Sequence, residues 1–246
     1  MLQLYQIEWL KLKRQHLWII LILIPILGCL LGAFNFVSSY DQLMKNGGND
    51  WYQLWTQMTF FYALILLPIL SGIFAAFICR VDHLDGGWKL TLSLPVQRGK
   101  YYIVKFSILS SILLLSQLIL ISAYCTIGFI LKLESELPVT FLFKAILSGW
   151  IATFPLAAIQ LWLSIRTKSF SGPLVLNILL TFASLITMIM KVDYLYPWAQ
   201  PSLAMKAPGE NGGLNSYTLF FSIIIIMFII VFFGSYRRFK KMDITF

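Results

Sequence analysis

Only a few residues of this chain have types and spacings that could do chemistry. His83 and Asp85 lie two residues apart within the polar stretch 80–105. A histidine beside a carboxylate can serve in acid–base catalysis, but a lone pair of this kind is more often a solvated feature of a loop. The sequence contains no phosphate-binding loop of the form G-x-x-x-x-G-K. We therefore predict no catalytic residue and no ATP site in this chain.

Metal and disulfide chemistry are not indicated either. Cys29, Cys79 and Cys125 each lie inside an apolar run, and no two of them have the spacing of metal ligands. The two histidines, His16 and His83, are far apart in the sequence. We therefore expect no metal site, no cofactor and no disulfide framework.

The composition indicates an integral membrane protein. Of the 246 residues, 59% are hydrophobic and 12% are charged, and the mean hydropathy is +0.81. Soluble domains carry about 45–50% apolar and about 25% charged residues, so polar side chains could not cover a soluble core here. The surplus of apolar residues also excludes a disordered chain. The net charge of +9 would favour nucleic-acid binding in a soluble protein, but in a membrane protein it reflects loop orientation, and we expect no nucleic-acid partner.

Six apolar stretches are each long enough to cross a bilayer, for which a helix needs about 20 residues. We expect helices because lipid offers no hydrogen-bond partner to the backbone. The predicted fold is therefore all-α, with a single transmembrane domain over residues 1–246. The predicted spans are 17–37, 57–79, 106–131, 143–165, 172–190 and 218–234.

The basic residues are concentrated in one set of loops, namely residues 1–16, 80–105, 166–171 and 235–246. These segments hold 14 of the 19 Lys and Arg residues but only four of the 10 acidic residues. The positive-inside rule places them in the cytoplasm, and an even number of spans likewise requires both termini on one side. Several aromatic residues would then form a belt near the outer boundary, as is typical of membrane proteins: Trp51, Trp55, Tyr194, Tyr196 and Trp198.

The N-terminal segment allows several interpretations. Leu2, Tyr5, Trp9, Leu12 and His16 share one face of a helix, which favours a helix lying on the cytoplasmic leaflet. A simple extension of the first span is the plainer alternative. The stretch 26–29 resembles a lipoprotein cleavage site, but removing the first span would leave an odd number of spans.

Polar groups within the spans are uncharged, and a charge occurs only at an edge, at Lys144. Ion-coupled transporters usually need intramembrane ionisable groups, so a self-powered transporter is disfavoured. The amides could line a substrate path, or they could form hydrogen bonds between helices. They are Asn35, Gln117, Gln160 and Asn177. Gly28 and Gly32 form a G-x-x-x-G pattern that lets another helix approach closely, within one chain or across a dimer.

The long basic loop 80–105 is the most specific feature. It begins with acidic residues, continues through a predicted short helix that ends at Pro95, and returns to the membrane through basic residues. Trp88, Leu92 and Pro95 give it an apolar side. This make-up is typical of a docking element for a soluble partner, although an ordinary juxtamembrane loop is the plainer alternative.

The pattern of this loop resembles the type 2 ABC transporter permeases. The matching residues are Asp82 or Asp85, Trp88, Lys89, Ser93, Pro95, Arg98 and Lys105. The six spans, the N-terminal helix and the long last outer loop are also similar. Within this family, the outer segment 196–201 and the short length resemble lantibiotic immunity permeases. The residues that carry this narrower resemblance are Tyr196, Pro197, Trp198 and Pro201.

This resemblance implies a function, a location and partners. The chain would be a multi-pass subunit of a bacterial cell-membrane exporter, paired with a second copy or a paralogous permease. A separate ABC ATPase would bind ATP and push on a coupling loop, whose residues here would be Asp82, Asp85, Trp88, Lys89, Leu92, Pro95 and Arg98. The implied cargo is an amphipathic antimicrobial peptide, reached through membrane lipid and cleared for self-immunity. Two alternatives remain: a permease for a lipid, drug or polysaccharide, and a membrane scaffold or sensor without transport.

Overall fold

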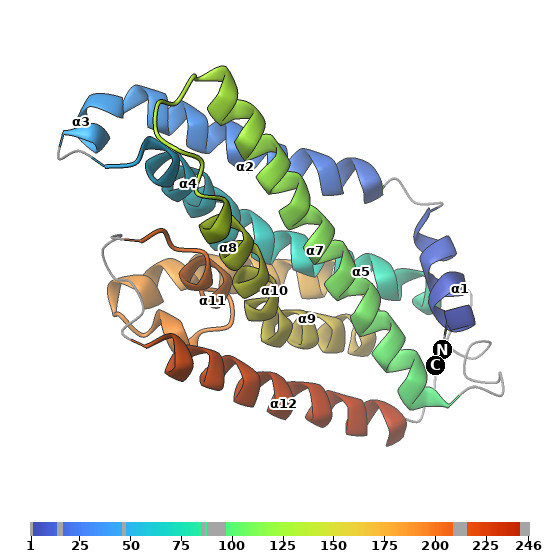
Figure 1. The fold of residues 1–246 in the computed structure, drawn as a ribbon. Coiled ribbons are helices and arrows are strands. Elements are labelled where there is room, and N and C mark those ends of the chain that lie inside the picture. The colour runs from blue at the N-terminus through green and yellow to red at the C-terminus, as the bar shows by residue number, and fades with distance from the viewer. Residues whose placement is uncertain are drawn as a thin grey trace.

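The computed structural model describes residues 2–13, 17–45, 48–84, 87, 97–208 and 216–241, and no strand occurs among them. The chain forms an elongated bundle of helices (Figure 1). Its elements in chain order are α1 (Leu2–Lys13), α2 (Leu17–Ser38), α3 (Tyr40–Met44), α4 (Asp50–Phe61), the π-helix η1 (Tyr62–Leu66), α5 (Leu67–His83), α7 (Arg98–Ile130), α8 (Val139–Ala152), α9 (Phe154–Arg166), α10 (Ser171–Ile189), the 3-10 helix η2 (Asp193–Leu195), α11 (Gln200–Ala204) and α12 (Tyr217–Lys241).

The prediction of six spans is confirmed, although two of them are composite. The second span is the continuous run α4–η1–α5, which covers residues 50–83, and the fourth is α8–α9, which covers 139–166. Helix α8 ends at Ala152 and α9 begins at Phe154, with Thr153 between them; Pro155, in the first turn of α9, has no backbone N–H to donate. Helix α7 begins at Arg98 rather than at residue 106. Its 33 residues make it about 50 Å long, against about 30 Å of hydrocarbon, so it extends beyond the apolar layer.

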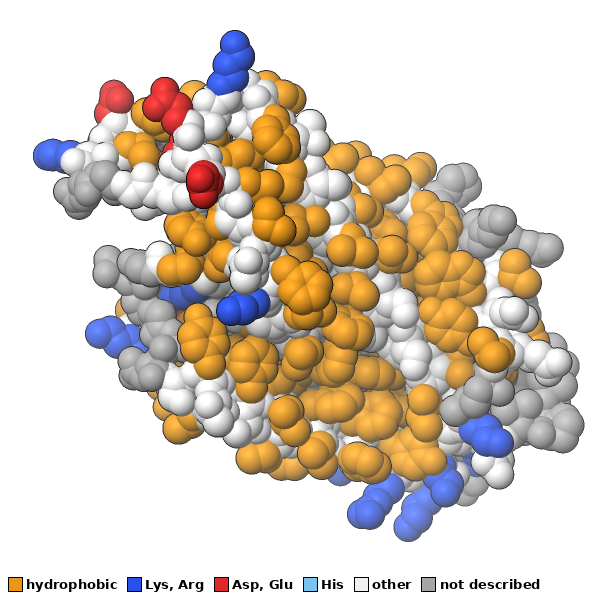
Figure 2. All heavy atoms as spheres, in the orientation of Figure 1, with side chains coloured by type: hydrophobic (Ala, Val, Ile, Leu, Met, Phe, Trp, Pro, Cys, Tyr) orange, Lys and Arg blue, Asp and Glu red, His pale blue; other side chains and the backbone are white. Residues whose placement is uncertain are grey.

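The two ends of the bundle differ in charge. We call the "basic end" the end where α2, α7 and α10 begin and α5, α9 and α12 end. Figure 1 shows α1 at this same end. Its described basic residues include Arg80, Arg98, Arg166 and the last turn of α12, with Arg238, Lys240 and Lys241. At the opposite end, acidic and basic side chains are mixed, and Figure 2 shows hydrophobic side chains covering the surface between the two ends.

Burial is unequal among the spans. The α4–α5 span is 67% buried in its most apolar window, whereas α2, α10 and α12 are 33%, 22% and 17% buried. The second span is therefore the centre of the bundle, whereas α2, α10 and α12 present apolar faces outward. The G-x-x-x-G pattern acts within the chain, because a Cβ at Gly32 would lie 2.4 Å from the Met58 Cα. Gly28 and Gly32 thus let α2 pack closely on α4 and η1.

The aromatic belt predicted at the outer boundary is partly wrong. Trp51, Trp55 and Trp198 are only 2%, 0% and 5% exposed, so they do not face the lipid–water interface. Their indole N–H groups instead donate to interior acceptors: Trp51 to the Ser135 carbonyl, and Trp55 to the Met205 carbonyl. Buried tryptophans need such acceptors. The acceptor for Trp55 is Met205, which directly follows α11.

Candidate coupling site and intramembrane polar contacts

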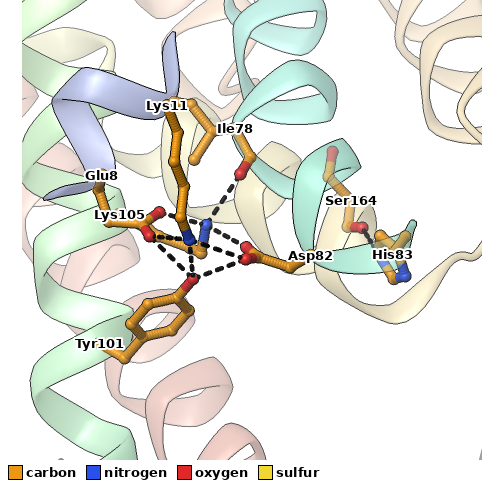
Figure 3. A network of polar contacts seen from close by, with 8 residues as sticks. All are labelled: Glu8, Lys11, Ile78, Asp82, His83, Tyr101, Lys105 and Ser164. Carbon is orange, nitrogen blue, oxygen red and sulfur yellow. Dashed lines mark hydrogen bonds and ion pairs between the residues drawn. The ribbon is translucent and has the colours of Figure 1, made fainter. Parts of the chain in front are cut away.

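A buried cluster of charges at the basic end joins three separate helices (Figure 3). Lys105 of α7 lies at its centre and is 0% exposed. Its Nζ is 2.8 Å from Glu8 Oε2 of α1 and 2.5 Å from Asp82 Oδ2 of α5. It also donates to the Ile78 carbonyl at 2.8 Å. One lysine therefore holds α1 and the end of α5 against the start of α7.

Two further residues complete this cluster. The Tyr101 hydroxyl is 2.8 Å from Asp82 Oδ1 and 3.1 Å from Glu8 Oε1, and its single proton serves one carboxylate at a time. Lys11, which is paired with Glu8, lies 3.2 Å from Asp82 Oδ1. Two lysines thus face two carboxylates, so the cluster is neutral. Glu8 and Asp82 are 3% and 2% exposed, and ions this deeply buried persist only when they are paired and hydrogen-bonded.

The cluster brackets the predicted coupling loop. Asp82 lies one residue before the end of α5, and Tyr101 and Lys105 lie in the first two turns of α7. Arg98, the first residue of α7, is half-buried. Both ends of the segment between α5 and α7 are therefore anchored in the same cluster of charged side chains. The other predicted coupling residues, Asp85, Trp88, Lys89, Leu92 and Pro95, lie outside the described residues, as does Ser93.

Sequence reasoning did not single out Glu8, Lys11 or Tyr101. The face predicted for the N-terminal helix on the leaflet consisted of Leu2, Tyr5, Trp9, Leu12 and His16. It did not include Glu8, which is buried. One signal was available, because Glu8 and Asp82 are among the few acidic residues of the basic loops. From the sequence alone, Lys105 is assigned to the loop, but the residue lies within α7.

His83 does not form part of this cluster. Its Nε2 lies 2.9 Å from the Ser164 carbonyl of α9, as Figure 3 shows. Asp85, its suggested partner, lies outside the described residues. Among the described residues, no group of three His, Cys, Asp or Glu side chains is placed to hold a metal ion.

The intramembrane amides fall into three situations. Asn35 of α2 donates to Gln57 of α4 at 2.6 Å, which links two neighbouring helices. Gln160 of α9 donates to Asn177 Oδ1 of α10 at 2.7 Å. Gln117 of α7 is 0% exposed, and within the described part of the chain neither of its side-chain polar atoms has a hydrogen-bond partner. The structure therefore brings Gln160 and Asn177 together but leaves Asn35 and Gln117 apart from them.

Asn177 is the most connected of these amides. Its Oδ1 also accepts from Trp198 Nε1 at 2.8 Å, and its Nδ2 donates to the Pro68 carbonyl at 2.8 Å. It lies against Gly72, where a Cβ would be 2.2 Å from Asn177 Nδ2. This one side chain thus connects α5, α9, α10 and the segment after η2.

The predicted outer-loop motif lies inside the bundle. The rings of Tyr196 and Trp198 stack with centroids 5.3 Å apart, and the Tyr196 hydroxyl donates to the Leu180 carbonyl of α10. Pro197 and Pro201 are buried. The segment continues into α11, whose Ala204 carbonyl accepts from Ser148 of α8. Residues 196–205 therefore form a segment that packs inside the bundle, and irregular backbone is tolerated at membrane depth where protein surrounds it.

Comparison with known protein families gives a match over most of the chain. A family described as "ABC-2 family transporter protein" matches residues 4–184, which is well over half of the chain. The matched range includes most of α1, the buried ion cluster and Asn177, and it ends before residues 196–205. No curated protein matches the chain.

Proposed function

The chain belongs to the ABC-2 family of transporter proteins, and we propose that it is the permease subunit of an exporter that removes a lantibiotic-like peptide from the membrane. The family implies a partner ABC ATPase in general. Specifically, we propose that this ATPase docks on the loop between α5 and α7, and that the subunit lies in the plasma membrane of a bacterium with both termini in the cytoplasm.

The buried ion cluster is the observation that carries the proposed coupling. Asp82 lies before the loop and Lys105 lies after it, and the two form an ion pair. Lys105 also forms an ion pair with Glu8 of α1. A force applied to the loop therefore acts on α1, α5 and α7 together rather than on one flexible connection. Because α7 is the longest single helix of the described chain and spans the whole bundle, movement of its first turns would reach the opposite end.

The exposed apolar surface of three spans supports a lipid-facing route for the cargo. Phe34 of α2, Leu179 of α10 and Ile230 of α12 are 75%, 64% and 66% exposed. An amphipathic peptide that sits in one leaflet could reach such surfaces without a polar tunnel. The same poorly buried helices would also supply the contact with a second permease, either another copy or a paralogue.

Deletion of the gene in its own strain tests this function. We expect greater sensitivity to the lantibiotic made by that strain or its neighbours, and unchanged sensitivity to a detergent that acts on the same membrane. Restoring the gene should restore resistance only when the partner ATPase is also present. Unchanged lantibiotic sensitivity, with the protein shown to be expressed, would favour a lipid, drug or polysaccharide cargo. Failure to co-purify with any ATPase would favour a scaffold or sensor.

A further inference from the structure

A cavity at the basic end lies apart from the ion cluster and has no assigned role. It has a volume of about 310 Å³ and is formed where α5 and α9 end and α10 begins. Its polar lining includes Arg80, His83, Ser164, Thr167, Lys168 and Ser169. None of the described lining residues is acidic, so the cavity is suited to an anion.

Arg80 is the side chain best placed to bind that anion. Its guanidinium lies over the rings of Phe77 and Phe170, at 6.0 and 5.3 Å from their centroids. Among the described residues it makes these ring contacts but has no hydrogen bond or ion pair. Stacking on two rings restricts the guanidinium while leaving its donors available. A planar fork of this kind binds phosphate oxygens in a bidentate way.

Two other features of the cavity point to the same ligand. Ser164 is only 2% exposed, and its Oγ has no hydrogen-bond partner among the residues that the structure describes. A buried hydroxyl of this kind is satisfied when a ligand supplies the acceptor or donor. In addition, α10 begins at Ser171, next to the lining residues Ser169 and Phe170, and runs for 19 residues. The positive end of its helix dipole therefore lies at the cavity.

The apolar surroundings indicate that the anion carries acyl chains. Phe170, Pro173 and Leu84 also line the cavity, and α10 continues from it with outward-facing side chains. Of these, Val175, Leu179 and Phe182 are 56%, 64% and 52% exposed. A lipid with its phosphate beside Arg80 could lay its chains along this face. If the basic end is cytoplasmic, the cavity opens to the leaflet that is rich in anionic lipid.

We propose that this cavity binds the phosphate of an anionic phospholipid and that Arg80 is the main residue that contacts this phosphate. The site would tie α5, α9 and α10 to the surrounding leaflet. Free phosphate shares the same headgroup chemistry, so the test must separate a lipid from a soluble anion.

Native mass spectrometry of the full chain without its ATPase gives that test, and its result does not depend on the proposed function. The detergent-purified protein is titrated with phosphatidylglycerol and, in parallel, with phosphatidylcholine. Sodium phosphate and glycerol 3-phosphate are added as soluble competitors. We expect phosphatidylglycerol to bind more tightly than phosphatidylcholine, and the soluble anions to displace it only at much higher concentration.

The variants Arg80→Gln and Arg166→Gln form a matched pair. Arg166 ends α9 at the same end of the bundle, is exposed, and does not line the cavity. Arg80→Gln should weaken phosphatidylglycerol binding about tenfold or more, as expected for a lost charged hydrogen bond, and Arg80→Lys should restore part of it. Arg166→Gln should bind as the unchanged protein does. Thermal unfolding of each variant verifies that it is folded.

Three outcomes would overturn the proposal. Equal losses in Arg80→Gln and Arg166→Gln would show only general surface attraction. Equal binding of phosphatidylglycerol and phosphatidylcholine would remove the preference for an anionic lipid. Binding of inorganic phosphate without binding of phosphatidylglycerol would assign the cavity to a soluble anion instead.

Discussion

Glu8 and Lys105 are 97 residues apart in the sequence, and their side chains form an ion pair of 2.8 Å at the basic end of the bundle. The two side chains are 3% and 0% exposed. Because each charge has lost its water, each depends on the other and on Asp82. The pair therefore helps to fix the position of α1, which also contacts the bundle through Lys11 and through a face that includes Tyr5, Trp9 and Leu12.

Removing the buried lysine should destabilise the protein far more than removing the exposed one. Lys105→Met leaves two buried carboxylates with one cation, and breaking a buried pair costs about 3–5 kcal/mol. Lys11→Met also leaves one cation for the two carboxylates, but the Lys11 side chain is 27% exposed, so water can replace part of what it supplies and we expect a smaller loss. Unfolding in detergent, followed by tryptophan fluorescence, measures both. The double variant Glu8→Gln/Lys105→Met should recover part of the loss; losses that simply add would show that the two residues are not coupled.

Asn177 should matter more for stability than Asn35, although both are intramembrane asparagines. Asn177→Leu leaves the Gln160 amide, the Trp198 indole and the Pro68 carbonyl without this partner. The expected loss is about 2 kcal/mol or more, since each orphaned group costs about 1–3 kcal/mol. Asn35→Leu breaks the hydrogen bond with Gln57, and an average interhelical hydrogen bond is worth about 0.6 kcal/mol. Unfolding of the two variants in the same detergent compares them, and equal losses would refute the role given to Asn177.

Much of the fold could be predicted because lipid imposes simple requirements. The apolar run 17–37 had to be a helix, and α2 covers Leu17–Ser38. The spacing of Gly28 and Gly32 indicated close helix packing, which α2 makes with α4. The extension of α7 to Arg98 was not predictable from hydropathy, because its first turns lie among charged groups rather than in lipid.

The candidate site was less accessible to sequence reasoning, because its members are brought together by tertiary packing. Asp82 could be singled out by its place before the loop. Its partner Lys105, however, also contacts Glu8, which is 97 residues away in the chain. Likewise, Trp198 follows an outer-boundary pattern, and nothing local shows that Asn177 of α10 accepts its N–H. Such contacts depend on which helices become neighbours.

The orientation of the chain in the membrane can be tested by cysteine labelling. Lys240 is exposed at the basic end, and Glu136 is exposed at the opposite end. In a version lacking Cys29, Cys79 and Cys125, Glu136→Cys should react with an impermeant maleimide in intact cells. Lys240→Cys should react only after the membrane is opened, because the basic end is expected in the cytoplasm. Asn211→Cys should behave like Glu136→Cys. The reverse pattern would invert the topology.

The purified chain should not bind ATP. Its sequence contains no G-x-x-x-x-G-K loop, and the energy for transport is expected from a partner subunit. Isothermal titration with ATP and Mg²⁺ should give no heat of binding for the chain alone. The complex with its ATPase serves as the positive control. Saturable binding to the isolated chain would contradict a division of labour between permease and ATPase.

The last prediction concerns the loop between α5 and α7. Trp88 and Leu92 give this loop an apolar side in a basic surrounding, and buried aromatic side chains tend to anchor interfaces, where truncation often costs about 2 kcal/mol or more. Trp88→Ala should therefore reduce affinity for the ATPase more than tenfold, since about 1.4 kcal/mol corresponds to one decade. Arg98→Ala should have a smaller effect, because Arg98 lies half-buried at the start of α7, where it could contact lipid headgroups.

Co-purification and transport in membranes with equal permease levels would measure this effect. Glu8→Gln provides an informative comparison, because it loosens the anchor of α1 without touching the loop's apolar side. We expect Glu8→Gln to keep ATPase binding while lowering transport per ATP hydrolysed, since the loop would still dock but would no longer move α1 together with α7. Trp88→Ala should lose binding itself. If Trp88→Ala retained full ATPase binding and transport, the loop would not be the coupling element, and the ion cluster would then serve only to hold α1 in place.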